Sequence, residues 1–141
     1  MNGDKIPDQD HIARFCGPAK TDGEEVQATA FMLRKDETYL SVNWLESLNS
    51  PNREGEIAIM RTIYSETFNR VGAAARIAVL NVGEMRQKVL EDSPDGRNLE
   101  VLHDPLPKDL SHSRINNLRY DDETIAELIL ETLLESYSAR E

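Results

Sequence analysis

The segment Tyr39–Glu46, which reads YLSVNWLE, constrains the fold of this chain more than any other. Leu40, Val42 and Trp44 alternate with polar side chains, and a period of two is typical of a β-strand with one buried face. We therefore predict a strand here whose apolar side chains pack in the core of the protein.

Other segments have helical or strand-like spacing, and together they indicate an α+β fold. Ser50–Pro51 opens a helix, because serine caps helices and proline is tolerated in the first turn, and apolar residues then recur at helical spacing up to Phe68. Residues 111–120 are ambiguous. We predict a mixed or antiparallel sheet of about five strands with about three helices. The other expected elements are an edge strand or a single helical turn at 11–16, strands at 26–33, 76–82 and 99–103, a hairpin of 26–33 with 39–46, a short helix at 83–90 and a last helix at 121–137.

The length and the cysteine content indicate one domain without a disulfide bond. The chain has 141 residues, the size of one typical domain, and its only cysteine, Cys16, excludes an intramolecular disulfide. Its first ten residues lack the apolar stretch of a signal peptide. We expect residues 1–10 to be a flexible N-terminus, residues 11–141 to form a single globular domain, and the protein to be cytoplasmic.

The charge balance argues against nucleic acids and membranes as partners. Sixteen Lys and Arg residues oppose twenty-six Asp and Glu residues, which gives a net charge of −10. Proteins that bind nucleic acids or anionic membranes concentrate positive charge on the contact surface, and here the basic residues are scattered. We therefore expect no nucleic-acid partner and no membrane partner. An acidic surface suits solubility and a basic protein partner.

The last expected helix is apolar over an unusually wide arc. At about 100° per residue, two neighbouring faces are apolar, so the helix is either deeply buried or offers its second face to a protein partner or to a second copy of the chain. The first face carries Ile125, Leu128, Ile129 and Leu133, and the second, the candidate binding face, carries Leu130, Leu134 and Tyr137.

Three histidines and an arginine are the candidates for chemistry. Histidine titrates near neutral pH and is the first choice for acid–base catalysis. His103 and His112 flank a proline-containing loop, and folding could bring His11 and Arg14 near them. The alternative is that the histidines are separate and structural. Cys16 is expected to be buried rather than a nucleophile, and no metal or cofactor is expected because the usual ligand spacings are missing.

Four segments of the chain resemble segments of small uncharacterised bacterial proteins. They are HIARFC at 11–16, YLSVNWLE at 39–46, VLNVG at 79–83, and His103-x-Pro105 followed by SHSRI at 111–115. The resemblance covers most of the chain; it implies a bacterial, cytosolic, single-domain protein and supplies no catalytic residues. If these segments form one surface, its polar and aromatic members are His11, Arg14, Trp44, His103 and His112.

Two classes of function fit these observations. The leading hypothesis is a non-enzymatic protein-interaction module, such as an immunity protein, an antitoxin or an adaptor, because the chain is small and acidic and its last helix is two-faced. The second hypothesis is a small histidine-dependent hydrolase or transferase acting on a nucleotide-like or phosphate-bearing substrate. It is motivated by the histidine-bearing loop and by Arg14, and the sequence leaves open whether the protein is an enzyme.

Overall fold

A computed structural model describes residues 3–68 and 70–140 of the chain. Six strands form one sheet in the order β6-β7-β4-β1-β5-β8, and every pairing within it is antiparallel. Three helices pack on this sheet, and a separate two-stranded hairpin lies beside it. The predicted α+β class is therefore confirmed.

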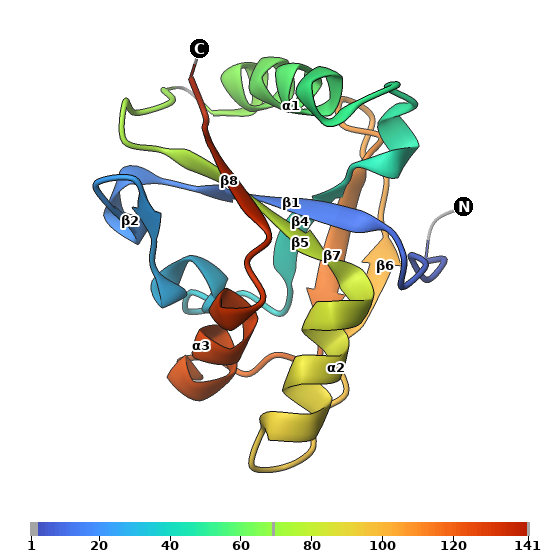
Figure 1. Ribbon diagram of the computed structural model, residues 1–141, viewed down its shortest axis with the longest axis vertical. Coiled ribbons are helices and arrows are strands. Elements are labelled where there is room, and N and C mark those ends of the chain that lie inside the picture. Colours follow the sequence, from blue (N-terminus) through green and yellow to red (C-terminus); the bar gives the residue numbers. More distant parts are fainter. Residues whose placement is uncertain (1–2, 69, 141) are drawn as a thin grey trace.

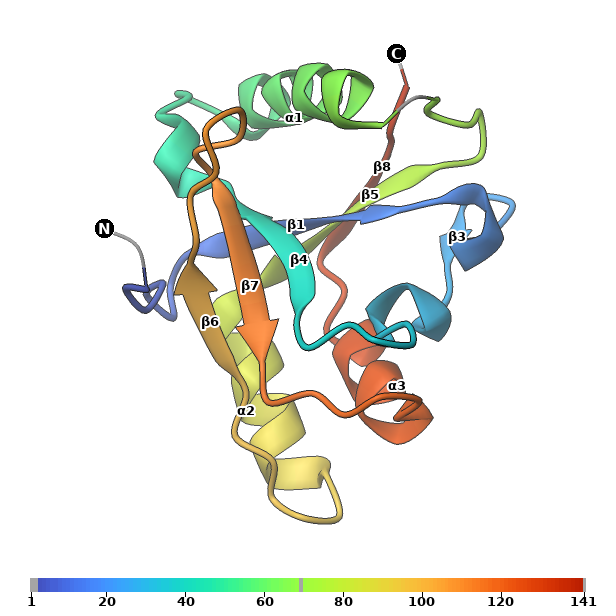
Figure 2. The same ribbon diagram turned by 180° about the vertical axis from the view of Figure 1, so that it is seen from behind.

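The elements follow one another irregularly along the chain, so strands that are neighbours in the sheet are often distant in the sequence. Figure 2 shows one such pair, β4 and β7, side by side. The elements are β1 (His11–Cys16), the 3₁₀ helix η1 (Pro18–Lys20), β2 (Thr21–Asp22), β3 (Glu25–Val26), the 3₁₀ helix η2 (Ala28–Phe31), β4 (Leu40–Trp44), the 3₁₀ helix η3 (Glu46–Leu48), α1 (Arg53–Thr67), β5 (Arg76–Asn81), α2 (Val82–Asp92), β6 (Glu100–His103), β7 (His112–Asn116), α3 (Glu123–Glu131) and β8 (Glu135–Ser138).

The sheet separates two apolar cores, because alternate side chains of a strand point to opposite faces. On one face, Ile12 and Leu80 pack under α2 and α3 in the larger core. On the other face, Ala13, Ile77 and Val79 pack under α1 in the smaller core. Figure 1 shows α1 on one side of the sheet and α2 and α3 on the other.

Each α-helix begins at a polar side chain that accepts a hydrogen bond from the first helical turn. Asn52, Asn81 and Asp122 accept from backbone N–H groups three residues further on, over 2.8, 2.8 and 3.1 Å. Such caps satisfy amides that have no partner inside the helix. None of the helices within residues 3–68 and 70–140 combines the length and the apolar character needed to cross a membrane.

Two predictions about strand pairing were wrong. The 11–16 segment is a strand, but it lies inside the sheet between β4 and β5 rather than at an edge. The 26–33 segment forms only the short strand β3 before it coils into η2, which buries Phe31. The predicted hairpin with 39–46 is absent from the described residues because β1 and β7 occupy both edges of β4.

The last helix is shorter than predicted. It ends at Glu131, and residues 135–138 form β8 on the outer edge of β5. The backbone N–H of Leu134 already donates to the carbonyl of Val79 over 2.9 Å. This pairing gives hydrogen-bond partners to the β5 edge, which a longer helix would leave unpaired. Leu134 and Tyr137 therefore lie outside the helix, and the predicted second helical face does not form.

Residues 3–10, predicted to be a flexible N-terminus, run beside β6. Lys5 pairs with Leu102 as an isolated antiparallel bridge, and the backbone N–H of Ile6 donates to Val101 over 3.0 Å. The Ile6 side chain is buried in the larger core. These contacts extend the hydrogen-bonded edge of the sheet beyond β6.

Candidate active site

The sheet face that carries α1 also has a polar part. The apolar side chains under α1 come mainly from β1 and β5, whereas β4 and β7 place Ser41, Asn43, His112 and Arg114 on the same face. An open cavity of about 1180 Å³, here called the trough, lies over β4 and β7. Its walls are residues 17–20, residues 34–39, the C-terminal end of α1 and the loop between β6 and β7.

Ser41, His112 and Asp104 form a connected chain of polar groups at this site. His112 Nε2 lies 3.3 Å from Ser41 Oγ, and His112 Nδ1 lies 2.9 Å from the backbone carbonyl oxygen of Asp104 and 3.5 Å from its carboxylate Oδ2. The β6–β7 register explains the arrangement: His103 is opposite Ser113, and the next residue, Asp104, donates its backbone N–H to the His112 carbonyl.

The surroundings of His112 fix the tautomer of its neutral ring. A carbonyl oxygen only accepts hydrogen bonds, so Nδ1 carries the proton that it donates to Asp104. Nε2 is then unprotonated and accepts from the Ser41 hydroxyl. The His112 residue is 7% exposed, whereas Ser41 is exposed in the trough. A base aimed at an accessible hydroxyl is the arrangement that activates a serine nucleophile.

A cationic side chain lies directly beside Ser41. Arg114 is opposite Ser41 in the β4–β7 ladder, and its guanidinium carbon is 5.4 Å from the centre of the Tyr39 ring. Its Nε is buried and has no hydrogen-bond partner among the described residues. Arg114 therefore holds its positive charge over the Tyr39 ring, on the strand position paired with Ser41.

Arg14 fills a gap in the sheet below Ser41. β1 and β4 pair only at Ile12–Trp44 and Ala13–Asn43, and beyond that point the two strands separate. Arg14 Nη1 donates to the Ser41 carbonyl and Nε donates to the Ala30 carbonyl, both over 2.9 Å. Desolvation by burial lowers the pKa of Arg14 from its ordinary value. Arg14 thus supports the backbone of the candidate nucleophile.

A buried network fastens the wall of the trough to its floor. Tyr64 Oη donates to Asn43 Oδ1 over 3.0 Å, while Asn43 Nδ2 donates to Asp109 Oδ2 and to Ser111 Oγ, each over 2.8 Å. Burial raises the pKa of Tyr64, so its hydroxyl stays a donor. The network connects α1, β4 and the β6–β7 loop, which also carries Asp104.

Aromatic side chains form one wall of the trough. The rings of Phe15 and Phe68 are stacked with their centres 4.3 Å apart, and Tyr64 packs against Phe15 at 5.1 Å. Phe68, the first residue after α1, is 38% exposed. These three residues are called the aromatic ledge below.

His103 and Trp44 lie on the opposite face of the sheet from His112. His103 pairs with Ser113, the neighbour of His112, so the two histidines point in opposite directions. The rings of His103 and Trp44 are 5.1 Å apart, and His103 Nε2 bonds the Leu110 carbonyl. Trp44 Nε1 donates to Asp10 over 2.9 Å. The structure therefore does not bring His103 to His112.

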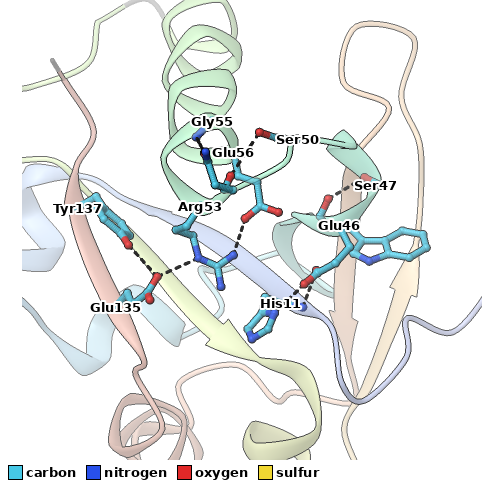
Figure 3. A network of polar contacts seen from close by, with 11 residues as sticks. His11, Glu46, Ser47, Ser50, Arg53, Gly55, Glu56, Glu135 and Tyr137 are labelled. Atoms are coloured by element: carbon cyan, nitrogen blue, oxygen red, sulfur yellow. Dashed lines mark hydrogen bonds and ion pairs between the residues drawn. The ribbon is translucent and has the colours of Figure 1, made fainter.

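His11 belongs to a different polar network, at the beginning of α1 (Figure 3). Its Nδ1 and its backbone N–H both contact the Glu46 carboxylate over 2.7 Å. Close by, Arg53 binds Glu56 and Glu135, and Tyr137 Oη donates to Glu135 over 2.8 Å. The His11–Glu46 contact joins β1 to η3 and the Arg53 contacts join α1 to β8, and neither group includes a residue of the Ser41–His112 chain.

The candidate binding residues of the C-terminal segment do not share one face. Leu130 packs against the larger core, and Tyr137 packs against the smaller core on the other side of the sheet. Leu134 is exposed between α3 and β8.

Cys16 does not line the trough, and the described residues hold no cluster of metal-ligating side chains. Cys16 is fully buried in the larger core, and desolvation raises the pKa of its thiol to about 11. It is therefore a protonated side chain at neutral pH. Across residues 3–68 and 70–140, no three His, Cys, Asp or Glu side chains are placed to hold a metal ion together.

Sequence reasoning found His112 and Arg14 but missed Ser41, Asp104 and Arg114. The alternation in YLSVNWLE does place Ser41 on the polar face of its strand, but nothing in the sequence indicates that β7 would be its neighbour. No family model, curated protein or solved structure matches the chain. Its resemblance to small bacterial proteins stays a prediction, and the case for a function depends on the site.

Proposed function

We propose that this protein is a small hydrolase or transferase in which Ser41 is the nucleophile and His112 the general base. The observation that carries the proposal is the chain from Ser41 Oγ through His112 to Asp104, in which His112 Nε2 lies 3.3 Å from the Ser41 hydroxyl. The basic side chains at the site support an anionic, phosphate-bearing substrate. The cytoplasm is the proposed location.

The reaction would proceed in two balanced halves. Ser41 Oγ attacks phosphorus while its proton moves to His112 Nε2; the Oγ–P bond forms, the bond from phosphorus to the leaving oxygen breaks, and that oxygen takes the proton from Nε2. Water or an acceptor hydroxyl then attacks, His112 takes its proton, and the Oγ–P bond breaks with return of a proton to Ser41. Arg114, paired with Ser41 across β4 and β7, would supply positive charge near the phosphoryl oxygens.

Labelling with a fluorophosphonate probe tests this assignment directly. Such a probe forms a bond from phosphorus to an activated serine oxygen with loss of fluoride, so it does not require the natural substrate. We expect peptide mass spectrometry to find the label on Ser41, and His112→Ala to slow labelling about 100-fold or more. Ser47→Ala, which changes a serine bonded to the Trp44 carbonyl, is the matched control. A folded protein that is labelled elsewhere or not at all overturns the proposal.

A protein-interaction module is the second candidate. Leu110 is 70% exposed on the loop between β6 and β7, and Leu106 on the same loop is also exposed. Apolar side chains within an otherwise acidic surface suit a partner protein. Native mass spectrometry of the protein purified from its own host separates the candidates: a stoichiometric second protein favours the interaction module, and a lone chain disfavours it.

A further inference from the structure

We infer that the trough takes a nucleotide, with its base against the aromatic ledge and its phosphate beside Ser41 and His112. The inference rests on the proposed function and names its substrate class. It follows from two different surfaces that lie within one cavity, one aromatic and one basic.

The aromatic ledge is suited to a flat ring. Phe15 and Phe68 are already stacked on each other, and Phe68 is 38% exposed although it lies among aromatic neighbours. Any nucleobase placed on such a ring gains stacking energy, because every base has a π-face. A sugar phosphate without a base would leave this wall unused.

The charge of the trough differs from that of the whole chain. Four basic residues and three acidic residues line it, whereas acidic residues outnumber basic ones by twenty-six to sixteen in the chain. One of the three carboxylates, Asp109, is already bound by Asn43 and Ser111. Arg34 is paired with a second carboxylate, Glu37. Lys20 and Lys108 therefore offer an anion the local positive charge that the acidic surface lacks.

The two surfaces are close enough to be spanned by one small molecule. Tyr64 belongs to the ledge, and its hydroxyl bonds Asn43, which is paired with His112 across β4 and β7. The base and the phosphate of one nucleotide would thus lie on either side of Asn43. The volume of about 1180 Å³ slightly exceeds the range of about 300–1,000 Å³ that is typical of small-molecule sites, so the trough has room for a nucleotide.

Isothermal titration calorimetry with a matched set of ligands tests the inference. The ligands are adenosine 5′-monophosphate, cytidine 5′-monophosphate, ribose 5-phosphate, adenosine and inorganic phosphate. We expect both nucleotides to bind at least about tenfold more tightly than ribose 5-phosphate or adenosine. Phe68→Ala should weaken nucleotide binding about tenfold and leave ribose 5-phosphate unchanged. The control, Tyr120→Ala, removes an aromatic ring that is 61% exposed and does not line the trough.

The outcomes separate the ligand class from the chemistry. Nucleotides that bind no more tightly than ribose 5-phosphate, or an equal loss in Phe68→Ala and Tyr120→Ala, overturn the inference. An oligonucleotide that binds more tightly than the mononucleotides also overturns it, because the occupant would then be a nucleic acid. Ser41→Ala should retain nucleotide affinity within about twofold, since stacking and charge remain. Nucleotide binding without fluorophosphonate labelling of Ser41 refutes the proposed chemistry and leaves the ligand class intact.

Discussion

Replacement of Tyr64 by phenylalanine isolates the hydrogen bond that joins α1 to the floor of the trough. The ring and its packing against Phe15 remain, and only the hydroxyl that donates to Asn43 Oδ1 over 3.0 Å is removed. Both residues are buried, at 4% exposure each, so water cannot readily replace the lost donor. The loss of one bond and an unsatisfied amide oxygen together destabilise the fold by about 2 kcal/mol.

Urea unfolding followed by circular dichroism measures this loss. Against a typical total stability of about 5–15 kcal/mol, a change of about 2 kcal/mol shifts the midpoint clearly without unfolding the variant. Tyr120→Phe, at an exposed tyrosine, is the matched control and should stay within about 0.5 kcal/mol of the wild type. If Tyr64→Phe is as stable as this control, the buried network does not hold α1 to β4.

A double-mutant cycle then tests whether Tyr64 acts through Asn43. Asn43→Ala removes the partner of Tyr64 and also the bonds to Asp109 and Ser111, and should destabilise the fold by about 3 kcal/mol. Once Asn43 is gone, Tyr64→Phe should add little, which gives a coupling energy of about 1–2 kcal/mol. Fully additive losses would contradict the connection.

Three further predictions concern Arg14, Cys16 and the histidines. Arg14→Lys loses the forked contact with Ala30 and Ser41 and should cost about 2 kcal/mol of unfolding free energy in urea; an unchanged midpoint would rule out the bridging role. Desolvation raises the pKa of Cys16 from 9.0 to about 11, so the stability that the protonated thiol contributes is present below pH 9 and is lost as the pH rises towards 11. Over that range the free energy of unfolding of the wild type should fall by about 2–3 kcal/mol more than that of Cys16→Ala. Parallel losses in the two proteins would refute this. His103→Ala and His11→Ala should keep the fluorophosphonate labelling rate of the wild type, whereas His112→Ala should not; equal rates in all three variants would remove His112 from its role.

The spacing of apolar residues predicted those helices and strands whose conformation depends on their own sequence alone. The alternation of Leu40, Val42 and Trp44 predicted β4, and the helical spacing of apolar residues after Ser50–Pro51 predicted α1. Each pattern is set by the one face that its element buries. The segment at 132–138 continues the apolar spacing of the last helix with Leu133, Leu134 and Tyr137, but it becomes an irregular turn and then β8. Its conformation is decided by the free edge of β5, about sixty residues earlier, and no local propensity carries that information.

The site could be predicted only as separate parts. His112 was a candidate from its chemistry and Ser41 lies on the polar face of a predicted strand, yet the two are 71 residues apart in the sequence. They meet because β4 pairs with β7, and the register of that pairing places Arg114 opposite Ser41. Asp104 joins them through the β6–β7 register. Each of these facts is a property of long-range pairing, which composition and periodicity do not determine.

Polar side chains on an uncovered sheet face do not by themselves require a function, because solvent satisfies them at no cost. The side chains around Ser41 differ from that case. His112 is almost fully buried and has both ring nitrogens committed, and the Arg114 Nε is buried with no hydrogen-bond partner among the described residues. The desolvation of the His112 ring is offset only by its two hydrogen bonds, and the unpaired Arg114 Nε has no such offset; an apolar pair at these two positions of β7 would avoid both costs. Natural sequences depart from such local rules mainly at functional sites. The position of both departures beside one exposed hydroxyl is the physical reason to look for chemistry at Ser41.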